Sequence, residues 1–371
     1  MSDAGFPFYA NEFTAELLTQ LIAQRYPGSV VDSFTVVEGL QYGDGNASTA
    51  GRCVFEVRYA PGSASELPSR IAIKIARVGA SPDHYVLYRN ELQFYERLRS
   101  SLTIETPQFY GSHLDEQTGT FALVMDDLQL RGVQFMNNQV LHTPDHVRLV
   151  LDVLATLHAK YWQSPALTGD LAWVHPHISG PLHEVFADRN RVPALIAAVI
   201  SQRHFKQEML QRMGVTPDDL YAQTMRAQQH QATLPQTLLH GDSHVGNTYR
   251  VERDGKLAGG LIDWQLIARG HYMHDVGYYI QTALCVGDRR KHERELIQHY
   301  LERLRQAGVT SPPDFNSAWL EYRRTCPWNI YVGWLAVDVA NYGWEICELA
   351  HLRVMTAYED LESAKAMVVL N

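Results

Sequence analysis

The apolar pattern changes character near Asp126-Asp127, and no other feature of the 371-residue sequence limits the possible folds as strongly. Before this point, short apolar runs bounded by turn residues predict strands. After it, apolar residues recur mainly at helical spacing. The order predicts an α+β fold class with two lobes. Residues 1–126 would form a small N-terminal β-sheet lobe with one helix among its strands, and residues 127–371 a larger, mainly helical C-terminal lobe.

The expected elements can be placed by residue number. In the N-terminal lobe we expect strands at 33–38, 52–59, 70–76, 108–112 and 120–125, and helices at 12–25 and 83–99. In the C-terminal lobe we expect a helix over 144–163, opened by Thr143 and Pro144, and helical insertions over 164–235. Short β segments follow at 238–240, 248–251 and 260–262, and one last long helix should run from about 329 to about 360.

The most informative motif is the loop His240-Gly241-Asp242-Ser243-His244-Val245-Gly246-Asn247, which lies between two of these β segments. Phosphoryl transfer to an alcohol needs a carboxylate near the attacking hydroxyl and oxygen ligands that hold Mg²⁺ on the phosphates. Asp242 and Asn247 supply both from one loop, with the spacing that protein kinases use in their catalytic loop. The loop therefore predicts phosphoryl transfer from ATP with Mg²⁺.

A second carboxylate stands at the end of an apolar strand, in Leu261-Ile262-Asp263-Trp264. Mg²⁺ is commonly held by one or two carboxylates together with phosphate oxygens. Asp263 and Asn247 are therefore the predicted metal ligands.

Lys74 lies between isoleucines on a predicted strand, in Ile73-Lys74-Ile75, and Glu91 follows on the next helix. A lysine in this setting is not typical of a strand surface. An ion pair between Lys74 and Glu91 would hold the ammonium group on the α- and β-phosphates of a nucleotide.

The loop at residues 43–48, Gly-Asp-Gly-Asn-Ala-Ser, is rich in small residues. Its backbone N–H groups could approach phosphate, and we predict nucleotide contacts at Asn46 and Ser48. A plain hairpin turn is the alternative. The sequence lacks the GxxxxGK[ST] pattern, so a P-loop fold is not indicated.

Taken together, these motifs resemble the aminoglycoside phosphotransferase and choline kinase superfamily, and most closely its ecdysteroid kinase-like (CHK kinase-like) branch. The loop at 240–247 resembles the family's HGDxHxGN catalytic loop, and Ile262-Asp263-Trp264-Gln265 resembles its metal-binding segment. Residues 123–128, Leu-Val-Met-Asp-Asp-Leu, resemble its hinge. The 43–48 loop departs from a full glycine-rich kinase loop.

The resemblance implies a bilobal, protein-kinase-like fold and a small-molecule kinase. Asp242 would be the catalytic base or the carboxylate that orients the substrate. Backbone groups of Met125 and Asp127 would contact adenine. Asp275, within the segment 269–277, would brace the catalytic loop.

Other functions remain open from the residues alone. His240, Asp242, His244 and Asp263 could surround Zn²⁺ in a metal-dependent hydrolase. The alternative role for His240 is to hold the loop in place through a hydrogen bond to the backbone. Ser243 could serve a serine hydrolase, but the G-x-S-x-G pattern is incomplete. A nucleotide-binding pseudokinase would keep the fold without turnover.

The motifs and the family resemblance imply a small-molecule alcohol as partner, and composition excludes other kinds of partner. The net charge of −9 and the pI near 6.0 disfavour nucleic acid. We expect no membrane span, because no apolar run is long enough, and no signal peptide. The scattered cysteines fit reduced thiols in a cytoplasmic protein.

The acceptor could be sterol-like, aminoglycoside-like or choline-like, and the oligomeric state is not indicated. An aromatic stripe could form helix core or line a substrate pocket: Trp328, Tyr331, Trp334, Tyr342 and Trp344.

Overall fold

The computed structural model describes residues 6–39, 49–331, 343–368 and 370. The chain divides into two compact units, Met1–Val133 and Gln134–Asn371. None of the helices in these described ranges combines the length and the apolar character needed to span a membrane.

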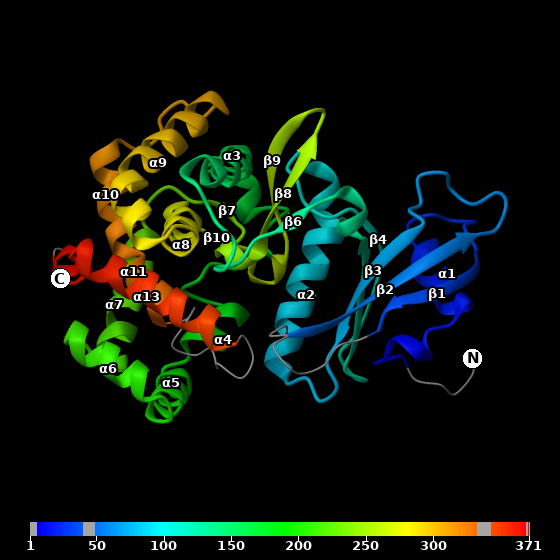
Figure 1. The fold of residues 1–371 in the computed structure, drawn as a ribbon, viewed down its shortest axis with the longest axis horizontal. Coiled ribbons are helices and arrows are strands. Elements are labelled where there is room, and N and C mark those ends of the chain that lie inside the picture. The colour runs from blue at the N-terminus through cyan, green and yellow to red at the C-terminus, as the bar shows by residue number, and fades with distance from the viewer. Residues whose placement is uncertain (1–5, 40–48, 332–342, 369, 371) are drawn as a thin grey trace. The chain divides into compact units, whose positions relative to one another are not determined.

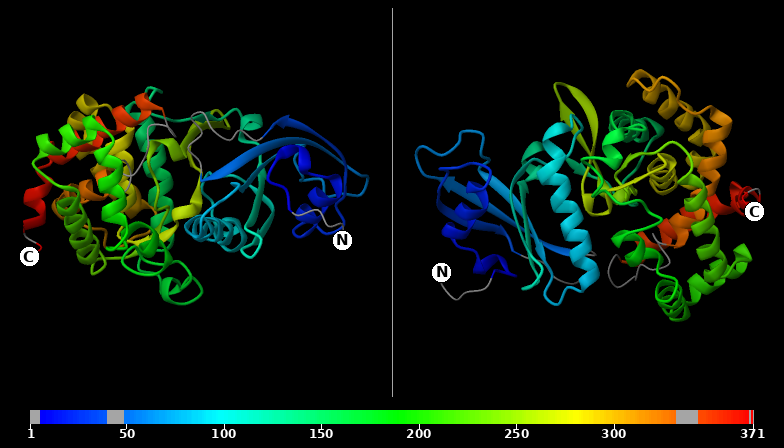
Figure 2. Two further views of the ribbon diagram at one scale, coloured as in Figure 1. Left: turned by 90° about the horizontal axis from the view of Figure 1, so that it is seen from below. Right: turned by 180° about the vertical axis from the view of Figure 1, so that it is seen from behind.

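The N-terminal unit is built on one antiparallel sheet with the strand order β1-β2-β3-β5-β4. Its strands are β1 (Val31–Glu38), β2 (Ala50–Tyr59), β3 (Arg70–Ala76), β4 (Phe109–Asp115) and β5 (Thr120–Asp126). Helices α1 (Ala15–Ala23) and α2 (Pro82–Arg97) lie on opposite faces of this sheet (Figures 1 and 2). The strands and helices predicted for this part are confirmed, with ends that differ by a few residues.

Strand β3 shows how the two faces of the sheet differ. Ile71, Ile73 and Ile75 are fully buried and share one apolar core with the inner face of α1. Because successive side chains of a strand point to opposite faces, Lys74 lies on the other face, where it meets α2. The alternation of side chains along the strand therefore points Lys74 toward α2, while the isoleucines before and after it point into the apolar core on the other face.

The C-terminal unit is mainly helical. Its longer helices are α3 (Pro144–Lys160), α4 (Pro181–Ala187), α5 (Val192–Ser201), α6 (His204–Met213), α7 (Pro217–Gln231), α8 (Met273–Ala283), α9 (Val286–Gln306), α10 (Phe315–Arg324) and α13 (Trp344–Asp360), with the short α11 (Cys326–Trp328) and α14 (Ser363–Val368). Helix α3 begins as predicted, because the Thr143 hydroxyl accepts the His146 N–H at 3.3 Å and Pro144 takes the first helical position.

Two small sheets in this unit carry the motif loops. In one, β7 (Thr237–Leu239) pairs with β10 (Ala268–Gly270). In the other, β8 (Thr248–Arg253) pairs with both β6 (Gln134–Phe135) and β9 (Lys256–Leu261). The β segments predicted near 238, 248 and 260 are confirmed, whereas β6 and β10 were not predicted because each has only two or three residues.

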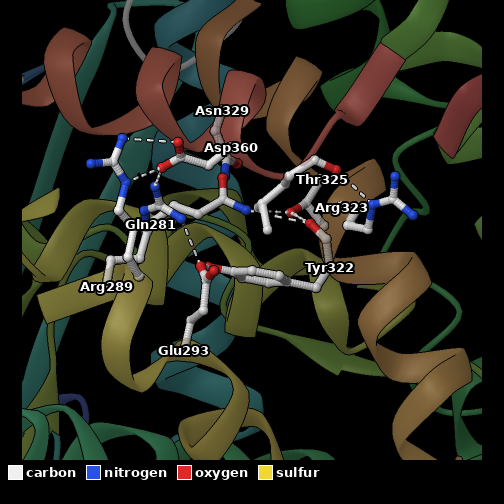
Figure 3. A network of polar contacts seen from close by, with 10 residues as sticks. Gln281, Arg289, Glu293, Tyr322, Arg323, Thr325, Asn329 and Asp360 are labelled. Atoms are coloured by element: carbon white, nitrogen blue, oxygen red, sulfur yellow. Dashed lines mark hydrogen bonds and ion pairs between the residues drawn. The ribbon is translucent and has the colours of Figure 1, made fainter. Parts of the chain in front are cut away.

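A polar network joins α8, α9 and α13 to the residues that follow α10 (Figure 3). Gln281 of α8 donates to the Thr325 hydroxyl at 3.1 Å and accepts from the Asn329 side chain at 2.6 Å. On α9, Arg289 donates to Glu293 at 2.7 Å and also pairs with Asp360 of α13. Since a buried charge must be paired, these contacts fix how the helices pack against one another.

The helix expected from about 329 to about 360 is confirmed only over its C-terminal part, where α13 spans Trp344–Asp360. Asn329–Tyr331 continue the short helix α11 as a π-helical turn, and α13 begins only at Trp344. Gly343 stands before it with φ of +76°, a left-handed conformation that an α-helix cannot contain. Of the aromatic stripe, Trp328 and Tyr331 are buried and Trp344 is exposed, while Trp334 and Tyr342 lie outside the described residues.

Candidate active site

The loop at 240–247 follows β7, and Asp275 on the first turn of α8 holds its start. Asp275 Oδ2 accepts the His240 N–H at 2.7 Å, and Oδ1 accepts the Gly241 N–H at 2.9 Å. The carbonyl oxygen of Asp275 accepts the Ser243 hydroxyl at 2.9 Å. These bonds fix the chain on both sides of Asp242, and they show the bracing by Asp275 that the family resemblance implied.

Asp275 is fully buried and is itself held from α3 and α9. His158 Nε2 donates to Asp275 Oδ2 at 3.1 Å, and His158 Nδ1 forms a hydrogen bond with the Tyr300 hydroxyl at 2.7 Å. Burial tends to raise the pKa of the Asp275 carboxyl, but the hydrogen bond from His158 and the neighbouring histidines hold the pKa below its ordinary value. Asp275 is therefore an anion that organises the loop.

Two buried histidines orient the loop further. His240 Nε2 donates to the Ile262 carbonyl at 2.9 Å, and its Nδ1 accepts the Asp242 N–H at 3.2 Å. His274 Nε2 donates to the Gly241 carbonyl at 3.0 Å. Burial lowers the pKa of both histidines, so both are neutral near pH 7. They act as fixed hydrogen-bonding groups around Asp242.

Asn247 lies directly against Asp242. Its Nδ2 donates to Asp242 Oδ2 at 3.0 Å and to the Asp242 carbonyl oxygen at 2.9 Å. Because the amide nitrogen faces Asp242 in this way, the amide oxygen points elsewhere, and it accepts no hydrogen bond from the described residues. An amide oxygen is one of the hard ligands that suit Mg²⁺.

Asp263 follows the end of β9, and this strand end is hydrogen-bonded to the loop that carries Asn247. The Ile262 N–H donates to the Asn247 carbonyl at 2.9 Å, and the Ile262 carbonyl accepts from His240. Asp263 is the next residue, and its φ of +64° is uncommon for a residue other than glycine. Residues held in such conformations cluster at functional sites. The structure thus brings the segment that carries Asp263 next to the loop that carries Asp242 and Asn247.

The predicted ion pair in the N-terminal unit also forms. Lys74 Nζ lies 2.7 Å from Glu91 Oε2, and both side chains are buried between β3 and α2. The strand period directs Lys74 toward α2, and the helix period places Glu91 on the buried side of α2. The pair holds an ammonium group in a fixed position on the sheet.

The remaining predicted nucleotide contacts fall in two places. Met125 lies in β5, and Asp127 follows the strand with its carboxylate 2.6 Å from the Arg70 guanidinium. Their backbone contacts with adenine stay a prediction. Asn46 and Ser48 lie outside the described residues.

The geometry disfavours both hydrolase readings. Each ring nitrogen of His240 already has a backbone partner, so His240 is not available to Zn²⁺. Across the described ranges, no group of three or more His, Cys, Asp or Glu residues is arranged to hold a metal ion. Ser243 is fully buried and donates to a carbonyl, which is unlike a reactive nucleophile.

Sequence reasoning missed His158, Tyr300 and His274. A signal for His158 was present, since it falls at helical spacing from Leu151 and Leu154 on the apolar face of α3. A histidine on such a face must find a partner inside the protein.

Comparisons with known proteins agree with this architecture. A sequence model of the ecdysteroid kinase-like family matches residues 79–309. No curated protein matches the chain at a significant level.

Several solved structures share the fold at low identity. The choline kinase from Cryptosporidium parvum is 12% identical, with a TM-score of 0.55 over 95% of this chain and 98% of that chain. The Plasmodium vivax ethanolamine kinase is 12% identical, with a TM-score of 0.53 over 90% of this chain and 84% of that chain. The GDP complex of aminoglycoside 2'-phosphotransferase-IIIa is 12% identical, with a TM-score of 0.52 over 94% of this chain and 99% of that chain. These likenesses confirm the predicted α+β, kinase-like bilobal fold class.

Proposed function

The chain belongs to the ecdysteroid kinase-like family, and from this premise we propose that it is a phosphotransferase that moves the γ-phosphoryl group of ATP to a hydroxyl of a small molecule. The family and the fold support a small-molecule kinase in general terms. The observation that carries the specific proposal is the contact between Asn247 and Asp242 on a loop held by Asp275.

We assign to Asp242 the orientation of the acceptor hydroxyl and the uptake of its proton. In phosphoryl transfer, most of the rate comes from positioning and from charge stabilisation rather than from covalent chemistry. The bonds from Asp275, His240 and His274 hold the loop in one conformation, so little reorganisation is needed when substrate binds.

The residues fit a Mg²⁺ ion bound to the nucleotide. The Asn247 amide oxygen points away from Asp242, and Asp263 supplies a carboxylate at the adjoining strand end. When bound, Mg²⁺ would neutralise charge on the phosphates. Lys74, fixed by Glu91, would contact phosphate oxygens. The structure of aminoglycoside 2'-phosphotransferase-IIIa with GDP supports a nucleotide as the phosphoryl donor.

A hydroxylated, sterol-like molecule is the first acceptor class to test. The rings of His177 and His274 lie 5.4 and 5.1 Å from the ring of Trp328. Burial lowers the pKa of both histidines, so this aromatic cluster behind Gly241 is uncharged near pH 7. Because His274 and Trp328 are buried, these rings form core rather than a contact surface, and the choice of a sterol-like acceptor rests on the ecdysteroid kinase-like family.

The test is an ADP-release assay with Mg·ATP across sterols, aminoglycosides, choline-like amines and sugars. We expect turnover with at least one class, loss of turnover in Asp242→Asn, and nucleotide binding that is retained in this variant. Full activity of Asp242→Asn would rule out the role of Asp242. Nucleotide binding without turnover on any acceptor would favour a pseudokinase.

A further inference from the structure

We propose that the C-terminal unit contains a second small-molecule site, a cavity that binds an organic anion with an apolar body. This cavity lies between α7 and α10, and we call it the α7–α10 cavity. Its volume is about 920 Å³, within the range of small-molecule sites. None of its lining residues has a role in the phosphoryl transfer proposed above, so this site goes beyond that function.

Tyr272 forms part of the inner wall of the α7–α10 cavity. It is fully buried, and its hydroxyl has no hydrogen-bond partner among the described residues. The Tyr272 ring stacks on the Tyr300 ring, with the two ring centres 5.4 Å apart, and this contact fixes its position. Burial and the nearby carboxylates of Glu321 and Asp314 raise the pKa of Tyr272, so the hydroxyl keeps its proton. The hydroxyl oxygen is closed off from the open space of the cavity, so an occupant would meet the wall that Tyr272 supports rather than its hydroxyl.

His271 supplies a hydrogen-bond donor in the α7–α10 cavity. Its Nδ1 accepts the Met273 N–H at 3.4 Å, so the proton of the neutral ring is on Nε2. Burial lowers the pKa of His271 to about 3, which keeps the ring neutral. Within the described residues Nε2 has no hydrogen-bond partner.

Arg324 adds a cationic donor. It is only 3% exposed; its Nε donates to the Ala366 carbonyl at 3.1 Å, and its Nη1 contacts His230 and Glu321. Its Nη2 donates to no described residue. Among the described lining residues Glu321 is already paired with Arg324. Two converging donors, one of them on a guanidinium group, favour an anion.

The other walls of the α7–α10 cavity define the body of the ligand. They are formed by Leu234, Pro235, Pro313, Leu320 and Leu370. Apolar walls with a few converging polar groups are typical of sites for small organic molecules. A flat or alicyclic carboxylate or sulfonate fits this combination better than inorganic phosphate, which would leave the apolar walls without contacts.

The position of the cavity links it to the catalytic loop. His271 and Tyr272 lie in the turn that leads into α8, and His274 of α8 donates to the Gly241 carbonyl at 3.0 Å. An occupant of the cavity would therefore touch the same short segment that holds the loop.

The test uses the intact chain and two fluorescent probes that differ only in the anionic group, 8-anilino-1-naphthalenesulfonate and N-phenyl-1-naphthylamine. We expect saturable binding of the sulfonate at one site, at least about tenfold tighter than the neutral probe, because a charge-assisted hydrogen bond is lost in the latter. Tyr272→Phe should change sulfonate binding by less than about twofold, because its hydroxyl is closed off from the cavity. Gln229→Trp, at an exposed position on the cavity wall, should block it.

Two controls separate the α7–α10 cavity from other surfaces. Ala222→Trp places the same side chain at an exposed position on α7 outside the cavity, and Tyr358→Phe removes a hydroxyl bonded to Gln223. Both should leave binding unchanged, and hydrogen exchange should slow over residues 226–235 and 311–324 when the sulfonate is bound. The proposal is overturned if the sulfonate does not bind, if Gln229→Trp binds it normally, or if the neutral probe binds as tightly. Because the readout is binding, the result does not depend on the proposed kinase activity.

Discussion

The carboxylate of Asp275 accepts the backbone N–H of Gly241 at 2.9 Å, which ties the residue before Asp242 to helix α8. The same carboxylate accepts from the His240 N–H and from His158 on α3. One buried anion thus joins the loop to two helices of the C-terminal unit. Because each of these donors would otherwise be buried without a partner, the position of the loop depends on this single side chain.

We therefore expect Asp275→Asn to be harmful although it preserves size. The new amide nitrogen would face an N–H donor where an oxygen now accepts. Breaking a buried ionic contact of this kind should lower the free energy of unfolding by about 3 kcal/mol. Turnover should fall at least about tenfold, with little change in nucleotide affinity, because the loop loses its fixed position. Urea unfolding and steady-state kinetics measure these two effects.

The control for this variant is Asp145→Asn, an identical change at an exposed position in the first turn of α3. It should change the unfolding free energy by less than about 0.5 kcal/mol. If Asp275→Asn were as stable and as active as the unchanged protein, Asp275 would not organise the loop.

Gly241 offers a test of the backbone itself. Its φ is +85°, and a Cβ atom there would lie 1.8 Å from the carbonyl oxygen of Leu266. A clash with backbone cannot be relieved by rotating a side chain. We expect Gly241→Ala to abolish turnover and to reduce stability well beyond the roughly 1–2 kcal/mol that a left-handed alanine costs. Thermal unfolding and the ADP-release assay give the two readouts.

Gly214→Ala separates the clash from the dihedral angle. Gly214 has a φ of +65°, but a Cβ atom at this position would meet no other atom within 4 Å. This variant should lose only about 1–2 kcal/mol and keep its turnover. Equal losses in the two variants would show that the contact with Leu266 is unimportant.

The parts of the site that depend on local sequence could be predicted. Lys74 and Glu91 were expected to pair because the lysine lies between isoleucines on a predicted strand and the glutamate follows on the next helix, as in protein kinases. Asp242 and Asn247 lie five residues apart in one loop, so their proximity needs no knowledge of the tertiary structure.

The parts that depend on packing between distant segments could not be predicted. His158 and Asp275 meet although 117 residues separate them, and helix periodicity identifies a buried face without identifying its partner. The start of the last helix was misjudged because the apolar spacing continues across Gly343, where the backbone turns left-handed. A glycine is compatible with a helix, so the sequence alone does not show that its φ is positive.

The stability of the chain should fall in mild acid, and His142 is one cause. It is buried, and its ring has only a weak contact with the Asn137 backbone, which does not offset the effect of burial. Burial, with the nearby guanidinium groups of Arg353 and Arg250, lowers the pKa of His142 to about 4. Between this value and the ordinary value of about 6.5, the unfolded chain binds a proton that the folded chain does not, so stability is lost as the pH falls through this range.

We expect His142→Leu to remove this part of the pH dependence. At pH 5 the neutral histidine should account for about 2 kcal/mol of lost stability, since each pH unit contributes about 1.4 kcal/mol. The variant should match or exceed the stability of the unchanged protein at pH 7, because a buried polar ring with only one weak polar contact is removed. Urea unfolding at pH 7 and pH 5 measures both effects. His204→Leu, at an exposed position that begins α6, is the control and should leave the pH dependence unchanged.

The Lys74–Glu91 pair allows stability and nucleotide binding to be separated. The ammonium and carboxylate groups lie 2.7 Å apart, with 10% and 2% of the two side chains exposed. Lys74→Met would leave the Glu91 carboxylate buried without its cation, which should lower the free energy of unfolding by about 3 kcal/mol. The double variant Lys74→Met/Glu91→Leu removes both charges and should recover most of that loss, since buried pairs are often replaced by apolar residues without harm.

Nucleotide binding should respond differently to the same two variants. If the ammonium group contacts the phosphates, both should bind Mg·ATP at least about tenfold more weakly, because restored packing does not restore the charge. Urea unfolding gives the stability, and isothermal titration calorimetry gives the affinity. Recovery of stability without recovery of affinity is the expected pattern. A double variant that bound Mg·ATP normally would show that the pair supports only the packing of α2 on the sheet, and the assignment of Lys74 to the phosphates would be withdrawn.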